Sequence, residues 1–348
     1  MKLWQLYEIS FLFKLFLITN VHGQSGLDSL EVFINNELDQ KNIPGLTACA
    51  VKGTEIKWFK SFGWENLEQE IPMREDAVMN IGSVSKTITA TAVMQLWEKN
   101  LLSLDSDVSD YLPLKIRNPN FPELPITIRQ LLTHTSSIID GPAYGGSYQC
   151  GDPQISLEHW IRHYFTRKGD FFNRKENFLS KEPGKSRKYS NVGFGLLGYI
   201  VQKVSGQSFN NYCKQNIFDP LRMTKTGWFL SEIEIENHVV PYVYVTKENR
   251  DFLANDFSKL FPNEKEFLLN NNIAACLYSF PNYPDGLLRT SVEDLSHFMT
   301  AMMNEGMFQG VSILRSTTID TMLSLQIEGN DQQGLCWNKT DFDSTWGH

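Results

Sequence analysis

One serine and one lysine are spaced so that they can act together. They are Ser83 and Lys86, the only Ser-x-x-Lys pair in the 348-residue sequence. On a helix this spacing puts both side chains on one face, within reach of each other. The positive end of a helix dipole favours a serine alkoxide, and a desolvated lysine can accept the serine proton near neutral pH. The pair predicts a nucleophile with its own base, although about one such spacing arises by chance in a chain of this length.

A second candidate is the tripeptide Tyr189-Ser190-Asn191, which follows Pro183-Gly184. Tyrosine relays protons when neighbouring cations lower its pKa, and asparagine binds amide carbonyls. The tripeptide alone favours a plainer interpretation, in which a loop tyrosine precedes a helix-capping asparagine.

Other catalytic patterns are weak or missing. His159 and His163 lie four residues apart on a probable helix, but no His-Glu-x-x-His accompanies them, which favours ordinary surface or core histidines over a metal site. No Gly-x-Ser-x-Gly predicts an α/β-hydrolase, and no Gly-x-Gly-x-x-Gly or P-loop predicts a nucleotide cofactor.

Hydrophobic spacing indicates the elements that position these residues. An amphipathic helix is expected over residues 30–38, followed by a hairpin of strands at 46–51 and 56–62 with Gly53 in the turn. Three later helices are expected: Val84 toward Asn100, residues 195–204 ended by Gly206, and one opened by a capping box of Ser291 and Asp294. Sheet elements separated by a helical excursion predict an α+β fold in two lobes.

Taken together, the motifs carry a family resemblance. The chain resembles the serine β-lactamase and penicillin-binding-protein family, in the branch of class C β-lactamases, D-alanyl-D-alanine carboxypeptidases and related esterases. The matching motifs follow in the family's order over roughly residues 30–348: Ile43-Pro44-Gly45-Leu46, Asn80-Ile81-Gly82-Ser83-Val84-Ser85-Lys86-Thr87, Leu102-Ser103-Leu104-Asp105, Tyr111-Leu112-Pro113, Ile128-Arg129-Gln130-Leu131-Leu132-Thr133-His134-Thr135-Ser136, Tyr189-Ser190-Asn191, Asp219-Pro220-Leu221-Arg222-Met223 and Gly286-Leu287-Leu288-Arg289-Thr290-Ser291.

The resemblance implies a role for each motif residue. Ser83 would be the acylated nucleophile, and Lys86 its proton partner. Tyr189 would be the general base for acylation and for activating the deacylating water, and Asn191 would bind the substrate amide.

The family's third motif, Lys-Thr-Gly or His-x-Gly on an edge strand, has two candidates. Lys225-Thr226-Gly227 is a literal match but follows Tyr189 too closely, in what reads as a loop of the helical lobe, so we expect it to be a decoy. Trp346-Gly347-His348 fits the opening of Gly-His-x-Gly, which assigns His348 to substrate binding.

The resemblance also implies more chain than the sequence contains. The family's last strands and C-terminal helix would follow His348, together with the second backbone N–H of an oxyanion hole whose first donor is that of Ser83. We therefore expect residues 24–348 alone to be poorly soluble and to hydrolyse little. Loop departures from the family pattern occur at Ser137, Arg222 and Leu287.

These features predict one β-lactamase-like α+β domain over residues 24–348. Its antiparallel sheet lobe would use residues 24–82 and 286–348, and its helical lobe residues 83–285. The implied function is a cofactor-free serine hydrolase that cleaves a β-lactam, a D-amino-acid peptide or a simple ester through an acyl-enzyme. The alternatives are a catalytically silent binding or assembly protein of the same fold and a metal-dependent hydrolase.

The first 23 residues form an apolar leader that opens with Lys2 and ends near Gly23. Glu8 and Lys14 interrupt it, so we expect a signal peptide and a secreted protein, with an uncleaved membrane anchor as the alternative. The sequon Asn338-Lys339-Thr340 is compatible with secretion.

Composition is that of an ordinary globular protein. Charged residues make up 21% and the net charge is −8, so no basic surface for nucleic acid is expected. The family resemblance implies a small-molecule or peptide substrate as the partner. The five cysteines lie far apart without metal-ligand spacing, so we expect buried small hydrophobes with at most one disulfide.

Overall fold

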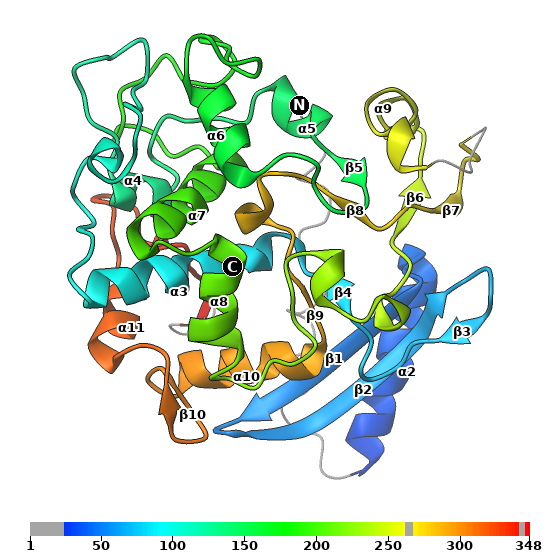
Figure 1. The fold of residues 1–348 in the computed structure, drawn as a ribbon. Coiled ribbons are helices and arrows are strands. Elements are labelled where there is room, and N and C mark those ends of the chain that lie inside the picture. The colour runs from blue at the N-terminus through cyan, green and yellow to red at the C-terminus, as the bar shows by residue number, and fades with distance from the viewer. Residues whose placement is uncertain (1–23, 262–266, 341–344) are drawn as a thin grey trace.

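The computed structural model describes residues 24–261, 267–340 and 345–348, which form helices and antiparallel strands in the expected α+β arrangement (Figure 1). The leader expected at residues 1–23 lies outside the described residues. In the part that is described, no helix is long and apolar enough to cross a bilayer.

The helices are short apart from α2, α3, α7 and α10. Their bounds are α2 Gln24–Lys41, α3 Ser85–Glu98, α4 Ile128–Leu132, α5 Pro142–Gly146, α6 Leu157–Phe165, α7 Asn191–Ser205, α8 Phe209–Cys213, α9 Arg250–Asp256, α10 Val292–Met303 and α11 Ser316–Met322. The strands are β1 Gly45–Lys52, β2 Glu55–Asn66, β3 Ile71–Pro72, β4 Met79–Asn80, β5 Gln149–Cys150, β6 Tyr242–Val245, β7 Asn271–Ala274, β8 Tyr278–Ser279, β9 Arg289–Thr290, β10 Met307–Phe308, β11 Val311–Ser312, β12 Asn338–Lys339 and β13 Trp346–Gly347.

The predicted hairpin and the helix before it are confirmed. β1 pairs antiparallel with β2, and Gly53 takes the positive φ of 63° that the turn needs. Helix α2 covers the hairpin, and Ile34 and Leu38 are buried with Phe62 of β2. This small core is what the amphipathic spacing predicted.

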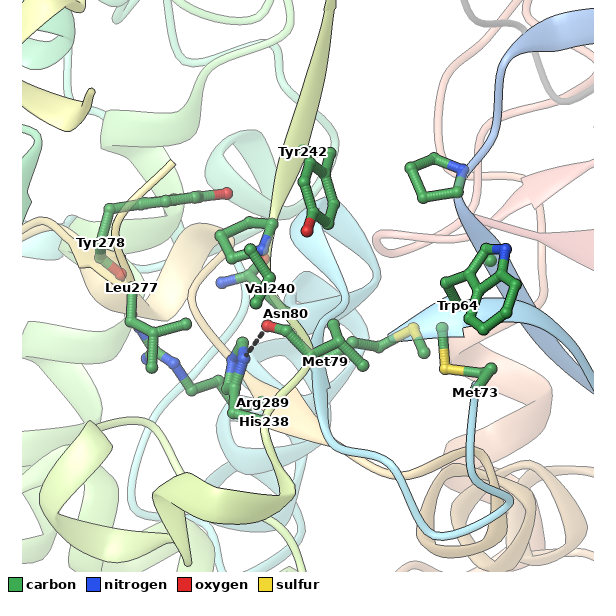
Figure 2. A pocket seen from close by; sticks show the side chains of 14 residues that line it. Trp64, Met73, Met79, Asn80, His238, Val240, Tyr242, Leu277, Tyr278 and Arg289 are labelled. Carbon is green, nitrogen blue, oxygen red and sulfur yellow. Dashed lines mark hydrogen bonds between the residues drawn. The ribbon is translucent and has the colours of Figure 1, made fainter. Parts of the chain in front are cut away.

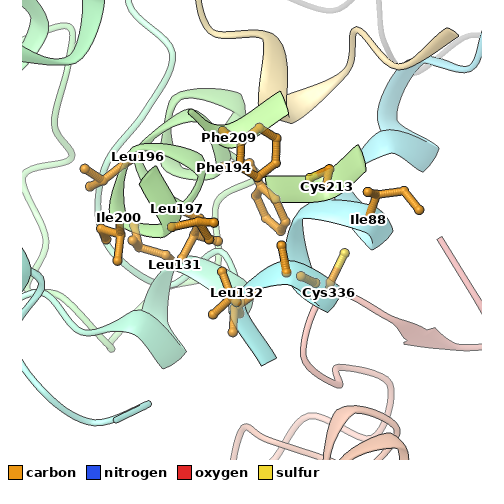
Figure 3. Packing of buried hydrophobic residues seen from close by; sticks show 14 of the residues in the cluster. Ile88, Leu131, Leu132, Phe194, Leu196, Leu197, Ile200, Phe209, Cys213 and Cys336 are labelled. Atoms are coloured by element: carbon orange, nitrogen blue, oxygen red, sulfur yellow. The ribbon is translucent and has the colours of Figure 1, made fainter. Parts of the chain in front are cut away.

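The main core is built around α3, the predicted second helix. Every residue from Ser85 to Leu96 is buried, because neighbours surround the helix on all sides rather than along one stripe. Figure 3 shows buried side chains of α3, α4 and α7 gathered in this core, among them Ile88, Leu131 and Leu197. The helix that follows the candidate nucleophile is therefore held rigidly.

Helix α7 begins four residues before its predicted start at Gly195. The glycines at positions 193 and 195 lower intrinsic helix propensity, which hid its first turn from a pattern search. The turn is stabilised by the Ser190 hydroxyl, which accepts from the Gly193 N–H over 3.0 Å. The predicted end is confirmed, since Gly206 closes the helix with a φ of 73°.

The predicted cap of α10 is only half correct. Ser291 accepts from the Asp294 N–H over 3.2 Å, as expected. The Asp294 carboxylate does not turn back to Ser291 but accepts from the Lys225 N–H and the Thr226 hydroxyl, both over 2.7 Å. Gly227 bridges to Arg289, so this tripeptide lies beside β9 and not in a loop of the helical lobe.

Short pairings join distant parts of the chain near the candidate nucleophile. β4 pairs with β9, in the register Asn80 to Arg289, which connects residues 79–80 to residues 289–290.

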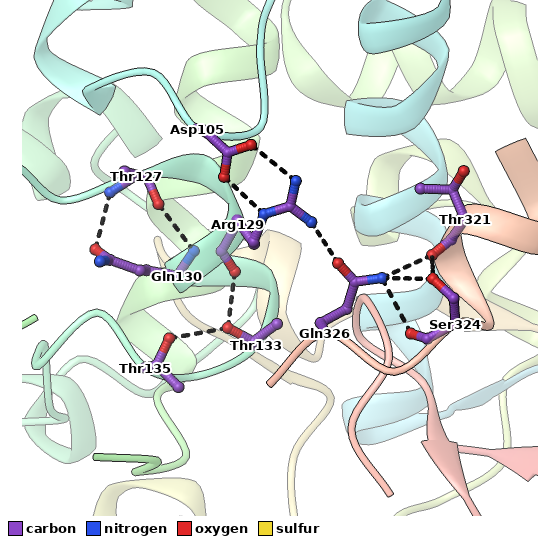
Figure 4. A network of polar contacts seen from close by, with 9 residues as sticks. All are labelled: Asp105, Thr127, Arg129, Gln130, Thr133, Thr135, Thr321, Ser324 and Gln326. Atoms are coloured by element: carbon purple, nitrogen blue, oxygen red, sulfur yellow. Dashed lines mark hydrogen bonds and ion pairs between the residues drawn. The ribbon is translucent and has the colours of Figure 1, made fainter. Parts of the chain in front are cut away.

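Figure 4 shows a polar network in which Arg129 joins Asp105 to Gln326. Gln326 also donates to the Thr321 carbonyl over 2.9 Å, which attaches the end of α11 to α4.

The cysteines differ from the expectation in one respect. Cys150 and Cys276 form the single disulfide that was allowed for, and Cys150 is exposed rather than a buried hydrophobe. Cys213 and Cys336 are free and buried, and Cys49 is free and half-buried.

Candidate active site

Ser83 lies on a single 3₁₀ turn, Gly82–Val84, that runs directly into α3. Gly82 has a φ of 52°, a conformation that favours glycine, and its N–H donates to the Asn80 side-chain oxygen over 2.8 Å. The serine was expected on the helix itself. The structure instead places it one tight turn ahead, where the helix dipole still favours negative charge on its oxygen.

Lys86 is fully buried and donates three hydrogen bonds from Nζ. The acceptors are Ser83 Oγ at 3.1 Å, Asn191 Oδ1 at 2.8 Å and the Asp285 main-chain oxygen at 2.5 Å. All three donors of the ammonium are thus used, and one of them faces the candidate nucleophile. The i, i+3 contact predicted from the sequence is present.

Tyr189 contacts the same serine oxygen as Lys86 does. Its hydroxyl donates to Ser83 Oγ over 2.6 Å, and its ring lies 4.9 Å from Lys86 Nζ. The side chain is 36% exposed, so solvent or a substrate can reach the hydroxyl pair. The structure therefore brings Ser83, Lys86 and Tyr189 together at one oxygen atom.

Asn191 is held at both ends of its carboxamide. Its Oδ1 accepts from Lys86, and its Nδ2 donates to Asp140 over 2.9 Å. Asp140 also accepts from the N–H groups of Asn191 and Val192, over 3.1 and 2.9 Å, so it caps α7 from a distant loop. Burial raises the pKa of Asp140, while these N–H donors and the Lys86 charge act in the opposite direction.

His134 is a residue of the site that pattern reasoning did not single out. It has a φ of 57°, its ring lies 4.4 Å from that of Tyr189 at a tilt of 33°, and its Nδ1 accepts from the Ser190 N–H over 3.1 Å. Burial and the charge on Lys86 lower the pKa of His134 well below its usual value, so the ring is neutral. It supports Tyr189 as a packed, uncharged ring.

Asp285 is a second acid that the sequence did not mark. Its main chain accepts from Lys86, and its carboxyl accepts from the Tyr144 hydroxyl over 2.5 Å. Burial raises the pKa of Asp285 to about 7, against the lowering effect of the Lys86 charge. A carboxyl that titrates near neutrality therefore lies directly behind the active-site amine.

Two glycines allow the segment that carries Asp285 to approach α7. A Cβ on Gly195 would lie 1.8 Å from Asn282 Oδ1, and one on Gly198 would lie 2.4 Å from the ring of Pro284. Asn282 in turn donates to the Asn191 main-chain oxygen over 3.0 Å. The position of the Asp285 main-chain oxygen, which accepts from Lys86, thus depends on small residues in α7.

His348 lies at the edge of the same site. Its Nδ1 faces the Cys336 main-chain oxygen at 2.9 Å, and its ring also interacts with the Ser83 backbone. Burial and the Lys86 charge lower the pKa of His348 to about 4, so the ring is neutral at pH 7. Its place beside Ser83 is compatible with contact to a substrate.

The remaining candidates lie elsewhere. His159 and His163 stack on each other at 4.0 Å on α6, and the described residues contain no group of three or more side chains placed to hold a metal ion. Lys225 is paired with Asp76 at 3.3 Å, and its hydrogen bonds in the structure do not connect it to Ser83.

The arrangement can move one proton over short distances. Two groups that exchange protons, an amine and a phenol, contact one hydroxyl at the positive end of a helix. When one of these two neighbours is deprotonated, it can take the serine proton while Ser83 Oγ attacks a substrate carbonyl carbon. This chemistry is that of acyl transfer.

Known proteins have sequences similar to that of this chain. Penicillin-binding protein 4* of Bacillus subtilis (strain 168) is 27% identical over 303 residues, which are 83% of this chain and 60% of that protein. Protein flp of Staphylococcus aureus (strain MRSA252) is 25% identical over 278 residues, 79% of this chain and 48% of that protein. The chain therefore spans about half to three fifths of the length of these relatives.

Solved structures share the fold. The octameric penicillin-binding protein homologue from Pyrococcus abyssi superposes with a TM-score of 0.64 at 25% identity, covering 89% of this chain and 64% of that one. D-amino acid amidase from Ochrobactrum anthropi SV3 superposes with a TM-score of 0.68 at 20% identity, covering 90% and 82%. The family model for beta-lactamase matches residues 30–336, and the chain belongs to the β-lactamase family.

Proposed function

We propose that the protein is a serine hydrolase that cleaves an amide or ester bond through an acyl-enzyme on Ser83. The observation that carries the proposal is the convergence of Tyr189 Oη at 2.6 Å and Lys86 Nζ at 3.1 Å on Ser83 Oγ. Packing and stability alone rarely place a phenol and a buried amine at hydrogen-bond distance from one hydroxyl. A serine nucleophile, by contrast, needs a proton acceptor at that distance.

The proposed step is balanced in atoms and protons. With one member of the Tyr189–Lys86 pair deprotonated, Ser83 Oγ forms a bond to the carbonyl carbon as its proton passes to that member. That proton then goes to the leaving nitrogen or oxygen as its bond to carbon breaks. Water then attacks the acyl carbon as the same pair takes its proton. The acid is released, and the proton returns to Ser83 Oγ as its bond to carbon breaks. The Ser83 backbone N–H, at the first turn, is the proposed donor to the developing oxyanion.

Asn191 and His348 are proposed to border the substrate. Asn191 holds Lys86 Nζ at 2.8 Å, so it orients the amine, and a substrate amide would compete with Asp140 for its Nδ2. His348 lies against the Ser83 backbone, where the carbonyl group of a substrate would arrive. Asn191 is 9% exposed, so little solvent reaches its carboxamide.

The proposed substrates are β-lactams, D-amino-acid amides or peptides and simple esters. Relatives named as a penicillin-binding protein and a D-amino acid amidase support an amide, and a solved neighbour named as a hydrolase with promiscuous acyltransferase activity supports an ester. Loop shape selects among them, and the fold does not.

We also propose that the protein is exported by the leader at residues 1–23. The disulfide between Cys150 and Cys276 supports an oxidising compartment. N-terminal sequencing of protein secreted by a eukaryotic host tests this: a chain that starts near Gln24 agrees, and an intact Met1 in the membrane fraction contradicts it.

A substrate panel tests the function. Chromogenic β-lactams, p-nitrophenyl esters and D-alanyl peptides are given to the wild type, Ser83→Ala and Tyr189→Phe, with exposed Ser103→Ala as the matched control. We expect Tyr189→Phe to slow the first turnover ~10²- to 10⁴-fold, the usual contribution of a positioned acid or base. Equal rates in the wild type and Ser83→Ala with every substrate would favour a silent binding protein.

A further inference from the structure

A cavity of about 220 Å³ lies outside the site described above, between the ends of the hairpin and strands β4, β6 and β9. Its lining does not include Ser83, Lys86 or Tyr189. Figure 2 shows its side chains arriving from both sides, with His238 and Arg289 next to each other.

Most of the cavity wall is apolar. Trp64, Met73, Met79, Val240 and Leu277 line it. The volume exceeds the ~150 Å³ that is enough to hold a benzene molecule in a protein interior. An aromatic ring or a short aliphatic chain therefore fits against these side chains.

Asn80 directs a donor at this cavity. Its side-chain oxygen accepts from the Gly82 N–H over 2.8 Å, which fixes the orientation of the amide. The other end, Nδ2, is buried and has no hydrogen-bond partner among the described residues. A buried amide nitrogen without an acceptor costs stability, and a ligand that accepts would remove this cost.

Arg289 brings a buried positive charge to the same cavity. It is 1% exposed, and its terminal nitrogens donate to main-chain oxygens of Trp228, Leu287 and Tyr278. Its Nε has no partner among the described residues. Buried cations are normally paired with an anion.

The carboxylates that act on the charge of Arg289, those of Asp152 and Glu232, accept hydrogen bonds from other groups. The carboxylate of Asp152 accepts from the N–H groups of Leu230 and Ser231, and that of Glu232 accepts from the N–H of Trp228. They favour the arginine charge without bonding to it. No acid among the described residues binds Nε, which exposes almost no surface, so an anion from outside reaches it only when neighbouring side chains shift.

His238 adds a group that can change its charge. Its Nδ1 faces the Val239 main-chain oxygen at 2.7 Å, which can only accept, so Nδ1 carries the proton and Nε2 a lone pair. Nε2 is buried without a partner among the described residues. Burial and the Arg289 charge lower the pKa of His238 to about 4.

We propose that this cavity binds a small monocarboxylate with an apolar group. One carboxylate oxygen would accept from Asn80 Nδ2, the other from Arg289 Nε, and the apolar group would lie against Trp64, Met79 and Leu277. His238 would take up a proton at Nε2 on binding and become the third donor.

Proton uptake gives the proposal a signature that an ordinary apolar cavity lacks. The bound anion compensates the Arg289 charge, so His238 is charged in the complex and neutral in the free protein. The nearby Arg74 and Glu65 pair with each other at 2.9 Å, and Arg74 also donates to the Glu236 main chain, so these charges are already matched. Between the two pKa values, affinity then improves up to tenfold for each unit of pH decrease.

Isothermal titration calorimetry of the full chain with 3-phenylpropionate tests the proposal. We expect one site, binding that strengthens severalfold from pH 8 to pH 6.5, and uptake of up to one proton measured in buffers of different ionisation enthalpy. The neutral analogue 3-phenylpropan-1-ol is expected to bind at least tenfold more weakly, and acetate, which lacks the apolar group, likewise.

Variants locate the site. Asn80→Asp keeps the acceptor for Gly82 but replaces the donor with a negative charge, and Val240→Phe fills the cavity. Both should weaken binding at least tenfold, while the exposed Val311→Phe should not change it. Ser83→Ala should bind as the wild type does, which separates this site from the proposed catalytic one.

Four results would overturn the proposal: no heat at the solubility limit of the probe, equal affinity for the acid and the alcohol, affinity independent of pH, or full binding by folded Val240→Phe. The first would mean that water alone satisfies the three buried groups. None of these results depends on whether Ser83 is acylated.

Discussion

Lys86 Nζ donates to the main-chain oxygen of Asp285 over 2.5 Å, although 199 residues separate them in the chain. The same bond places the Asp285 carboxyl, which accepts from Tyr144, behind the amine that contacts Ser83. Lys86 of the candidate site is therefore positioned by a segment that folds back on α7, and burial raises the pKa of the acid in that segment, Asp285, to about 7.

The first prediction concerns that close approach. Gly195→Ala puts a methyl group 1.8 Å from Asn282 Oδ1, so the Asn282 side chain must move and its bond to the Asn191 main chain is lost, which we expect to loosen the segment that leads to Asp285. We expect a loss of about 1–3 kcal/mol in the free energy of unfolding and a ~10- to 100-fold slower acylation of Ser83. Urea unfolding and labelling rates measure the two effects.

Gly145→Ala is the matched control, because a Cβ there meets nothing within 4 Å. It should retain the wild-type labelling rate. Unchanged acylation in Gly195→Ala would show that the Asp285 carbonyl does not position Lys86.

The second prediction separates two lysines. Lys86→Met removes the amine 3.1 Å from Ser83 Oγ and leaves the buried Asp140 without its neighbouring charge, so Ser83 acylation should slow ~10²-fold or more. Lys225→Met, in the literal Lys-Thr-Gly, should label almost as fast as the wild type. A severe loss in correctly folded Lys225→Met would assign the third family motif to that tripeptide instead.

The third prediction follows from the pKa of about 7 for Asp285. The folded protein keeps this proton up to about pH 7, whereas an unfolded chain releases it near its usual value of ~4. Between these values the folded state binds more protons, so its stability falls as pH rises. From pH 5 to pH 8 the wild type should lose about 2–3 kcal/mol that Asp285→Asn does not lose.

Denaturant unfolding at both pH values measures this difference, and the exposed Asp331→Asn serves as the control. Asp140 and Asp285 raise each other's pKa, so Asp285→Asn also makes Asp140 easier to ionise and widens the difference between the two pH profiles. Parallel pH profiles for wild type and Asp285→Asn would mean that Asp285 ionises as an ordinary acid.

The fourth prediction concerns the disulfide. Cys150 and Cys276 close a loop of 126 residues, and removal of such a link costs roughly 2–5 kcal/mol of stability. Cys150→Ser/Cys276→Ser should unfold at lower urea concentration by this amount, and Cys49→Ser, which breaks no bond, should shift little. Identical midpoints for the double variant and the wild type would contradict a formed disulfide.

The sequence predicted the parts of the site that depend on local spacing. The Ser83–Lys86 contact follows from one helical turn, and the hairpin and α2 follow from period and turn chemistry. Tyr189 and Asn191 came from the family resemblance, because nothing in a tripeptide states that it meets a serine 106 residues away.

What was missed depends on tertiary contacts. Asp140 and Asp285 are single acids in loops, and only the fold reveals that they surround Lys86. The start of α7 was missed because its glycines suit close packing rather than helix propensity, and the Asp140 carboxylate that caps it is distant in sequence. The Asp294 carboxylate was assigned to a local cap, but the Thr226 hydroxyl and the Lys225 N–H bind it instead.

The most direct test of the proposed nucleophile is peptide mapping after reaction with a fluorophosphonate. Trypsin releases residues 75–86 as one peptide that contains both Ser83 and Ser85, so fragmentation must assign the adduct to one of them. The account predicts a single adduct on Ser83 that is absent from Ser83→Ala. An adduct on Ser85 or elsewhere, or equal labelling of Ser83→Ala, would contradict it.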